Sequence, residues 1–157
     1  MVYFVVCIVI LIFDLLTKIW AQTRLQGIGT IPLVEGVFHL TYVENRGAAF
    51  GILQNQRVFF ILITLVFAAV VVYVISKYKN RPAVLDLGLS FMAAGALGNM
   101  IDRIWRGFVV DMFDFRLIDF PVFNVADIFV CIGAGLLAIF FIFFDGKEKE
   151  REDNSKS

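Results

Sequence analysis

The stretch "PVFNVADIFVCIGAGLLAIFFIFF", residues 121 to 144, decides the fold class. From Val122 to Phe144 it has the length and composition of a membrane-spanning helix, which needs about 20 mostly apolar residues. The rest of the chain agrees, because 60% of its 157 residues are hydrophobic and its mean hydropathy is +0.84. Soluble domains have a smaller apolar share. The sequence therefore predicts an α-helical membrane protein.

Three further stretches reach spanning length. The four predicted transmembrane helices are Val2–Ala21, Val58–Ile75, Ala83–Ile101 and Val122–Phe144. The first stretch has no basic region before it and no small-x-small cleavage site, and it contains two charged residues, so we expect a retained helix and not a signal peptide. We expect one catalytic membrane domain over residues 1–145, followed by a charged cytoplasmic tail over residues 146–157.

The basic residues predict how these helices are oriented. The loop "KYKNRP" between the second and third helices carries three basic residues, and the tail "DGKEKEREDNSKS" follows the fourth helix. By the positive-inside rule both segments are cytoplasmic, so both termini are expected there. The opposite, extracytoplasmic segments contain "GVFHLTYVEN" and "GFVVDMFDF", which are rich in β-branched and aromatic residues. This composition predicts short β-strands outside the membrane.

Charge and composition exclude several classes of partner. The 14 basic and 14 acidic residues cancel, so no net positive charge attracts nucleic acid. Neither Cys7 nor Cys131 lies in a CxxC motif, and His39, the single histidine, has no partner at metal-ligand spacing. We therefore expect no metal, no organic cofactor and no nucleic-acid partner.

The first predicted helix contains an acid and a base. Asp14 and Lys18 lie four residues apart, which places them on one helix face, and acid before base is the favourable order for an ion pair. A pair that only fixes helix packing is one interpretation, because charged residues within membranes usually pair.

The third predicted helix carries a stripe of small and polar residues. Gly88, Gly95, Asn99 and Asp102 follow one another at helical spacings. We expect the glycines to let a neighbouring helix approach closely. Asp102 with the adjacent Arg103 is interpreted as a structural pair.

The head of the fourth predicted helix has a structural explanation of its own. Asn124 and Asp127 have the spacing of an N-cap residue and an acid in the first turn. That explanation does not cover Asp111, which lies in a predicted strand among apolar residues.

These polar groups are all predicted near the outer surface of the membrane. They are Asp14 with Lys18, "ENRGAAFG" at residues 44–51, Asn99 with Asp102 and Arg103, Asp111, and Asn124 with Asp127. An ionisable group costs at least ~2.5 kcal/mol at the bilayer centre, so their convergence at one depth indicates a functional site.

The available reactive groups are carboxylates, amides and guanidiniums, and no Ser/His or Cys/His pair is present. Two close carboxylates can share one proton, so that one activates water while the other polarises a carbonyl, as in aspartic proteases. A proton-coupled transporter could use the same groups. Four spans, no internal repeat and no polar path through the cytoplasmic half argue against transport. The residues alone do not show which acids pair.

Five motifs occur in an order and at spacings that resemble those of the bacterial lipoprotein signal peptidases, also called signal peptidase II. They are "DLLTK", "ENRGAAFG", "GALGNMIDR", "GFVVDMF" and "FNVAD". The resemblance implies an intramembrane aspartic endopeptidase of the bacterial inner (plasma) membrane. Such an enzyme removes signal peptides from diacylglyceryl-modified prolipoproteins by cleaving before the lipidated cysteine, at a site near the extracytoplasmic face.

The same resemblance implies roles for individual residues. Asp111 and Asp127 would form the catalytic dyad. The supporting residues would be Asp14, Lys18, Asn45, Gly47, Asn99, Asp102, Arg103 and Asn124. Asp114 and Asp119 lie outside the motif residues and are interpreted as loop residues.

The implied partners are prolipoprotein substrates, membrane lipid and a globomycin-type cyclic peptide inhibitor, whose site would overlap the dyad. The alternative is a non-enzymatic small membrane carrier or lipid-binding protein, in which the acids are structural caps and pairs.

Overall fold

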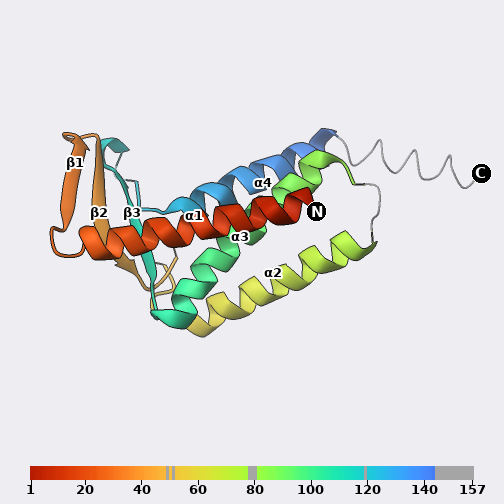
Figure 1. Ribbon diagram of the computed structural model, residues 1–157, viewed down its shortest axis with the longest axis horizontal. Helices are drawn as coiled ribbons and strands as arrows, with labels where there is room; N and C mark the ends of the chain where they lie inside the picture. Colours follow the sequence, from red (N-terminus) through yellow and green to blue (C-terminus); the bar gives the residue numbers. More distant parts are fainter. Residues whose placement is uncertain (49, 51, 78–80, 119, 144–157) are drawn as a thin grey trace, which may run out of the picture.

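The structure is a computed structural model that describes residues 1–48, 50, 52–77, 81–118 and 120–143. Four helices form an elongated bundle, and a small antiparallel sheet lies across one end of it (Figure 1). The N-terminus and the last described turn of the fourth helix lie at the other end, away from the sheet. The predicted tail at residues 146–157 falls outside the described residues, as does Asp119.

The helices are α1 (Val2–Arg24), α2 (Arg57–Lys77), α3 (Ala83–Trp105) and α4 (Val125–Phe143). Each is long and apolar enough to cross a membrane, which confirms the predicted four-span fold. The predicted start of the fourth helix, Val122, is too early. Phe123 instead forms a bridge with Phe113 of the sheet, so the helix begins only after Asn124.

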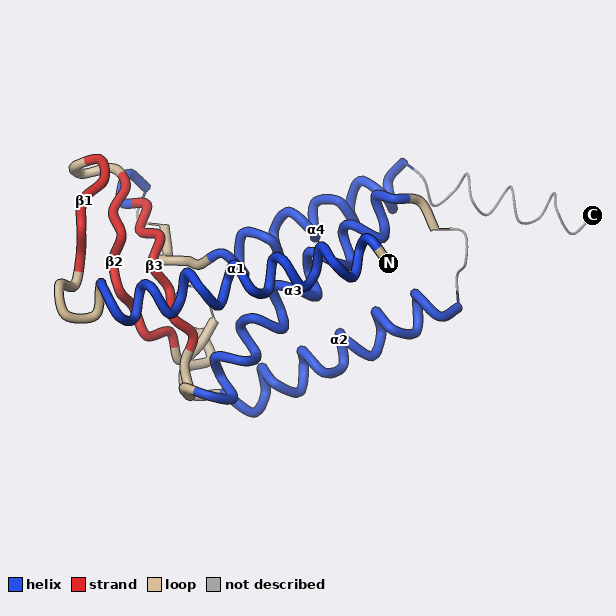
Figure 2. The backbone as a smooth tube through the Cα atoms, viewed as in Figure 1, coloured by secondary structure: helices blue, strands red, loops and turns tan. Residues whose placement is uncertain are grey.

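The sheet contains β1 (Thr30–Val34), β2 (Phe38–Asn45) and β3 (Val109–Phe115), paired antiparallel in that order (Figure 2). The two predicted strand segments form β2 and β3. Asp114 was expected in a loop, and that expectation is wrong. Asp114 lies in β3, where its buried carboxylate accepts hydrogen bonds from Thr41 and Arg116.

Helix α3 packs against each of the other three helices. Its approach to α4 depends on glycine, as predicted: a Cβ on Gly95 would overlap the carbonyl oxygen of Ala126. Farther from the sheet, a Cβ on Gly133 would lie 2.7 Å from the carbonyl oxygen of Gly88. The contact of Gly95 with Ala126 holds the first turn of α4 beside the outer end of α3, where the polar residues gather.

Candidate active site

The two predicted catalytic acids line one pocket at the sheet end of the bundle. Asp111 comes from β3 and Asp127 from the first turn of α4, and the pocket has a volume of about 520 Å³. Asn45, Asn99 and Arg103 also line it, and most of its remaining wall is apolar. A reacting group in this pocket would therefore meet two carboxylates within a largely apolar surrounding.

The start of α4 holds Asp127 by reciprocal capping. The backbone N–H of Asp127 donates to Asn124 Oδ1 at 3.0 Å, and the backbone N–H of Asn124 donates to Asp127 Oδ2 at 3.2 Å. This arrangement confirms the predicted cap. The other oxygen of Asp127, Oδ1, accepts a hydrogen bond from Asn99 Nδ2 at 2.8 Å.

Asn124 also contacts the other acid. Its Nδ2 donates to Asp111 Oδ1 at 2.6 Å, and Asn45 Nδ2 donates to Asp111 Oδ2 at 3.0 Å. Asp111 is only 1% exposed. Burial and the neighbouring charge of Asp127 raise the pKa of Asp111 from its ordinary value of 3.8 to about 7. One asparagine side chain therefore links the cap of α4 to a buried acid on β3.

The side-chain amides of Asn45, Asn99 and Asn124 are each oriented by a hydrogen bond to the amide oxygen. Each amide oxygen accepts a hydrogen bond from a group that can only donate. The donors are the backbone N–H of Gly47 for Asn45, Lys18 Nζ for Asn99 and the backbone N–H of Asp127 for Asn124. Because the oxygen already accepts a hydrogen bond, the NH₂ group of each amide faces the carboxylate of Asp111 or Asp127.

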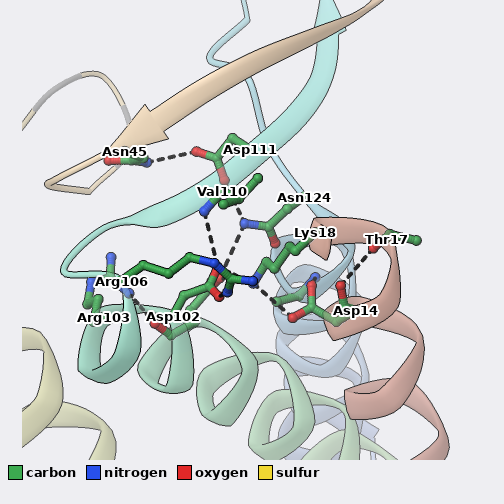
Figure 3. A network of polar contacts seen from close by, with 12 residues as sticks. Asp14, Thr17, Lys18, Asn45, Asp102, Arg103, Arg106, Val110, Asp111 and Asn124 are labelled. Carbon is green, nitrogen blue, oxygen red and sulfur yellow. Dashed lines mark hydrogen bonds and ion pairs between the residues drawn. The ribbon is translucent and has the colours of Figure 1, made fainter. Parts of the chain in front are cut away.

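A buried charge cluster lies beneath these amides (Figure 3). Lys18 Nζ lies 2.8 Å from Asp14 Oδ2 and 3.5 Å from Asp102 Oδ2, and all three side chains are fully buried. The predicted pair of Asp14 and Lys18 is confirmed. Asp14 also accepts a hydrogen bond from the backbone N–H of Ala126 at 2.8 Å, so the same pair fixes the start of α4.

The predicted pairing of Asp102 with Arg103 is wrong. Asp102 instead pairs with Arg106, one helical turn later. Adjacent residues on a helix point in different directions, whereas residues four apart share a face. Arg103 donates to the carbonyl oxygen of Gly47 at 2.9 Å, and its guanidinium lies 4.4 Å from the ring centroid of Phe60.

Gly47 is required at its position by the space around it. A Cβ there would lie 2.5 Å from the carbonyl oxygen of Ile52 and 2.9 Å from the Gln54 side chain. The glycine thus allows the loop after β2 to fold tightly, and its N–H and C=O contact Asn45 and Arg103.

A model of the Signal peptidase (SPase) II family matches residues 6–143. The chain belongs to the signal peptidase II family. The lipoprotein signal peptidase of Clostridioides difficile (strain 630) is 46% identical over 149 residues, covering 95% of this chain and 100% of that protein. The lipoprotein signal peptidase of Halothermothrix orenii is 48% identical over 141 residues, covering 89% and 94% respectively.

Two solved structures, both described as bacterial membrane enzymes, share the fold of this signal peptidase II family member. One has a TM-score of 0.82 at 33% sequence identity, covering 90% of this chain and 87% of that one. The other has a TM-score of 0.80 at 34% identity, covering 92% and 94%. The family suggested by the five motifs and the multi-pass membrane fold are therefore both confirmed.

All ten site residues suggested by the signal peptidase II resemblance lie in this one connected region. Sequence reasoning missed Arg106, although its spacing of four from Asp102 on a helix was a usable signal. It also missed the backbone groups of Val110 and Ala126, for which no side-chain pattern exists. Among the described residues, no group of three or more His, Cys, Asp and Glu side chains is arranged to hold a metal ion.

Proposed function

We propose that this chain is an intramembrane aspartic endopeptidase that removes the signal peptide from diacylglyceryl-modified prolipoproteins. Cleavage would fall before the lipidated cysteine. The observation that carries the proposal is the pair formed by Asp111 and Asp127, which line one pocket and are linked through Asn124. Membership of the signal peptidase II family supports the substrate class.

The environments of the two acids support different roles. A pKa of about 7 keeps Asp111 partly protonated at neutral pH, so Asp111 would donate a proton to the scissile carbonyl oxygen. Asp127 lies in the first turn of α4, where the helix dipole favours a negative charge. Asp127 would therefore act as the base on water.

The proposed reaction needs no group besides water and these two carboxyls. Water attacks the carbonyl carbon before the lipidated cysteine while its proton passes to Asp127, and the carbonyl oxygen takes the proton of Asp111. Collapse of the resulting diol breaks the C–N bond, and the proton held by Asp127 passes to the departing amine. The diol returns its proton to Asp111, which restores the pair.

The pocket wall suits a lipid-bearing substrate. Ile128, Cys131 and Ile132 follow Asp127 along α4 and line the pocket with it. These side chains extend from the acids along a helix that can span a membrane, so hydrocarbon would contact them while the scissile bond reaches the carboxyls. A globomycin-type inhibitor would occupy the same pocket.

The proposed location is the bacterial inner membrane, with both termini in the cytoplasm and the sheet end facing outward. The N-terminus and the end of α4 lie at the end of the bundle away from the sheet, which supports this orientation. We also propose that residues 1–145 form a single catalytic domain and that residues 146–157 are a cytoplasmic tail.

The test is cleavage by the full-length protein purified in detergent. It is incubated with a diacylglyceryl-modified prolipoprotein and with the unmodified form of the same prolipoprotein. We expect release of signal peptide from the modified form only. No cleavage of either form would support a carrier or lipid-binding protein, and equal cleavage of both would contradict the proposed lipid requirement.

A further inference from the structure

One carboxylate that does not line the pocket contacts the strand bearing the first catalytic acid. Asp102 Oδ2 accepts a hydrogen bond from the backbone N–H of Val110 at 3.1 Å, and both groups are buried. Val110 immediately precedes Asp111 in β3 (Figure 3). The position of the Asp102 carboxylate therefore fixes the backbone next to Asp111.

The same carboxylate also influences the second catalytic acid. Asp102 Oδ2 lies 3.5 Å from Lys18 Nζ, whereas Lys18 donates to Asn99 Oδ1 at 2.9 Å. Asn99 in turn donates to Asp127 Oδ1 at 2.8 Å. If Lys18 moved closer to Asp102, Asn99 Oδ1 would lose the charged one of its two donors and keep only Asn124 Nδ2, which lies 3.2 Å away. The Asn99 amide would then be held less firmly toward Asp127.

Arg106 provides the second counterion of Asp102. Its Nη1 pairs with Asp102 Oδ1, and its Nε donates to Gln22 Oε1 of α1 at 3.0 Å. The Arg106 side chain is 16% exposed, and it does not line the pocket. Without Arg106, the buried charge of Asp102 would depend on Lys18, which Asp14 also binds at 2.8 Å.

We propose that Arg106 is a positioning residue for the catalytic pair, acting through Asp102 on β3 and through Lys18 on Asn99. This inference rests on the proposed function, because its effect is measured as cleavage. Arg106 does not contact Asp111 or Asp127. It belongs to a cluster of ion pairs whose other members are Asp14 and Lys18 on α1 and Asp102 near the end of α3.

The first test compares full-length Arg106→Gln with Arg106→Lys and with a matched control, Arg24→Gln. Arg24 is an exposed arginine in the last turn of α1. For Arg106→Gln we expect kcat to fall about tenfold with little change in KM, since a misplacement of reacting groups by about 1 Å can cost about a hundredfold and we expect a smaller shift here. Arg106→Lys should recover most of this loss, and Arg24→Gln should match the wild type.

The pH profile separates positioning from general loss of structure. The charged groups that act on Asp111 are Asp127, Lys18 and Arg103. If the loss of Arg106 lets β3 shift, the distances from Asp111 to these groups change, so the alkaline limb of kcat/KM should move in Arg106→Gln. Arg106→Lys keeps the charge and should keep the wild-type limb. A lower amount of folded enzyme would reduce the rate equally at every pH, and an unmoved limb would overturn the proposal.

A double-mutant cycle tests whether Arg106 acts through Asp102. In the Asp102→Asn background the buried charge is gone, so adding Arg106→Gln should cause no further loss of kcat. A full additional loss in that background would overturn the proposed route. If Arg106→Gln does not accumulate as folded protein, Gln22→Leu releases the Nε contact of Arg106 instead. That variant should lower kcat by a smaller factor, and an unchanged kcat would overturn the proposal.

The two proposals fail in different ways. If the wild-type protein cleaves neither form of the prolipoprotein, the proposed function is wrong. If the wild type cleaves the modified form and Arg106→Gln cleaves it with wild-type kcat, only the role of Arg106 is wrong.

Discussion

The two ends of this bundle are held together by different contacts. At the sheet end, charged and amide side chains such as Lys18, Asp102 and Asn124 are fully buried and hydrogen-bonded or ion-paired. At the other end, α2, α3 and α4 meet through an apolar cluster of Val71, Leu85, Leu89 and Phe140. The close approach of α3 and α4 at Gly88 and Gly133 adds to this packing.

The difference indicates that only the sheet end of the bundle requires contacts with a defined direction. Lipid gives helices no hydrophobic reason to associate, so at the end away from the sheet the helices are held by close packing of apolar side chains and by the approach of Gly133 to Gly88. Catalysis requires acids at defined positions, and hydrogen bonds fix direction as well as distance. We therefore expect changes at the sheet end to alter the reaction, and changes at the other end to alter stability alone.

The largest expected effect is the loss of either catalytic acid. Asp111→Asn and Asp127→Asn should each lower kcat at least about a thousandfold, as removal of one member of a catalytic group does elsewhere. Asp114→Asn is the matched control, because Asp114 lies on the same strand but does not line the pocket. Signal peptide release is measured, and substantial cleavage by either dyad variant would contradict the assignment.

Lys18→Met should have the next largest effect. It leaves Asp14 and Asp102 buried near each other without their shared counterion, which costs about 3–5 kcal/mol for a buried pair. Thermal unfolding in detergent measures this loss. Arg24→Met, which changes an exposed basic residue in the last turn of the same helix, should change the unfolding temperature much less. The double variant Asp14→Asn with Lys18→Met should be more stable than Lys18→Met, and a less stable double variant would contradict the charge argument.

Activity should also depend on pH through Asp111. Because its pKa is raised to about 7, the proton needed for the carbonyl oxygen is lost above that pH. The value of kcat/KM should then fall about tenfold for each further pH unit. A profile that stays flat to pH 9 would show that Asp111 does not act as the acid.

The same pKa shift predicts a stability effect with a definite sign. The folded pKa of about 7 exceeds the ordinary value of 3.8, so the folded state keeps a proton that the unfolded state releases as the pH rises between these values. The stability contributed by this group is therefore lost from about pH 4 to pH 7. Unfolding temperatures of Asp111→Asn should decline less over this range than those of the wild type.

The sequence predicts the four helices well because a membrane-spanning helix requires about 20 mostly apolar residues, and apolar runs of this length are rare in other structures. It predicts β2 and β3 from composition. It does not predict β1, whose sequence "TIPLV" is short and contains a proline suited to an edge strand. The start of α4 was misplaced because an apolar run does not reveal the bridge between Phe113 and Phe123.

The site residues could be named from motifs, and helical spacing predicted two local contacts, the pair of Asp14 with Lys18 and the cap formed by Asn124 and Asp127. The other contacts of the site could not be predicted. The pairing of Asp102 with Arg103 failed because neighbours in a helical sequence do not share a face. The contact between Asn124 and Asp111 depends on how β3 folds back over the start of α4, which is a tertiary event with no local signal. These contacts, and not the residue types, separate a capped helix from a candidate catalytic pair.

The smallest expected effect tests the end away from the sheet. A Cβ in Gly133→Ala would lie 2.7 Å from the carbonyl oxygen of Gly88 and 2.8 Å from the backbone N of Met92, so α3 and α4 must separate slightly. Overpacking of this kind costs about 1–3 kcal/mol. Gly135→Ala, two residues along the same helix, meets nothing within 4 Å and should unfold at the wild-type temperature or slightly above it. The kcat of folded Gly133→Ala should stay close to the wild-type value. The hydrogen bonds of Asp127 lie in the first turn of α4, nearer to the sheet than the contact of Gly133 with α3. A large fall in kcat would show that packing far from the sheet also positions the acids, and that the two ends of the bundle are not independent.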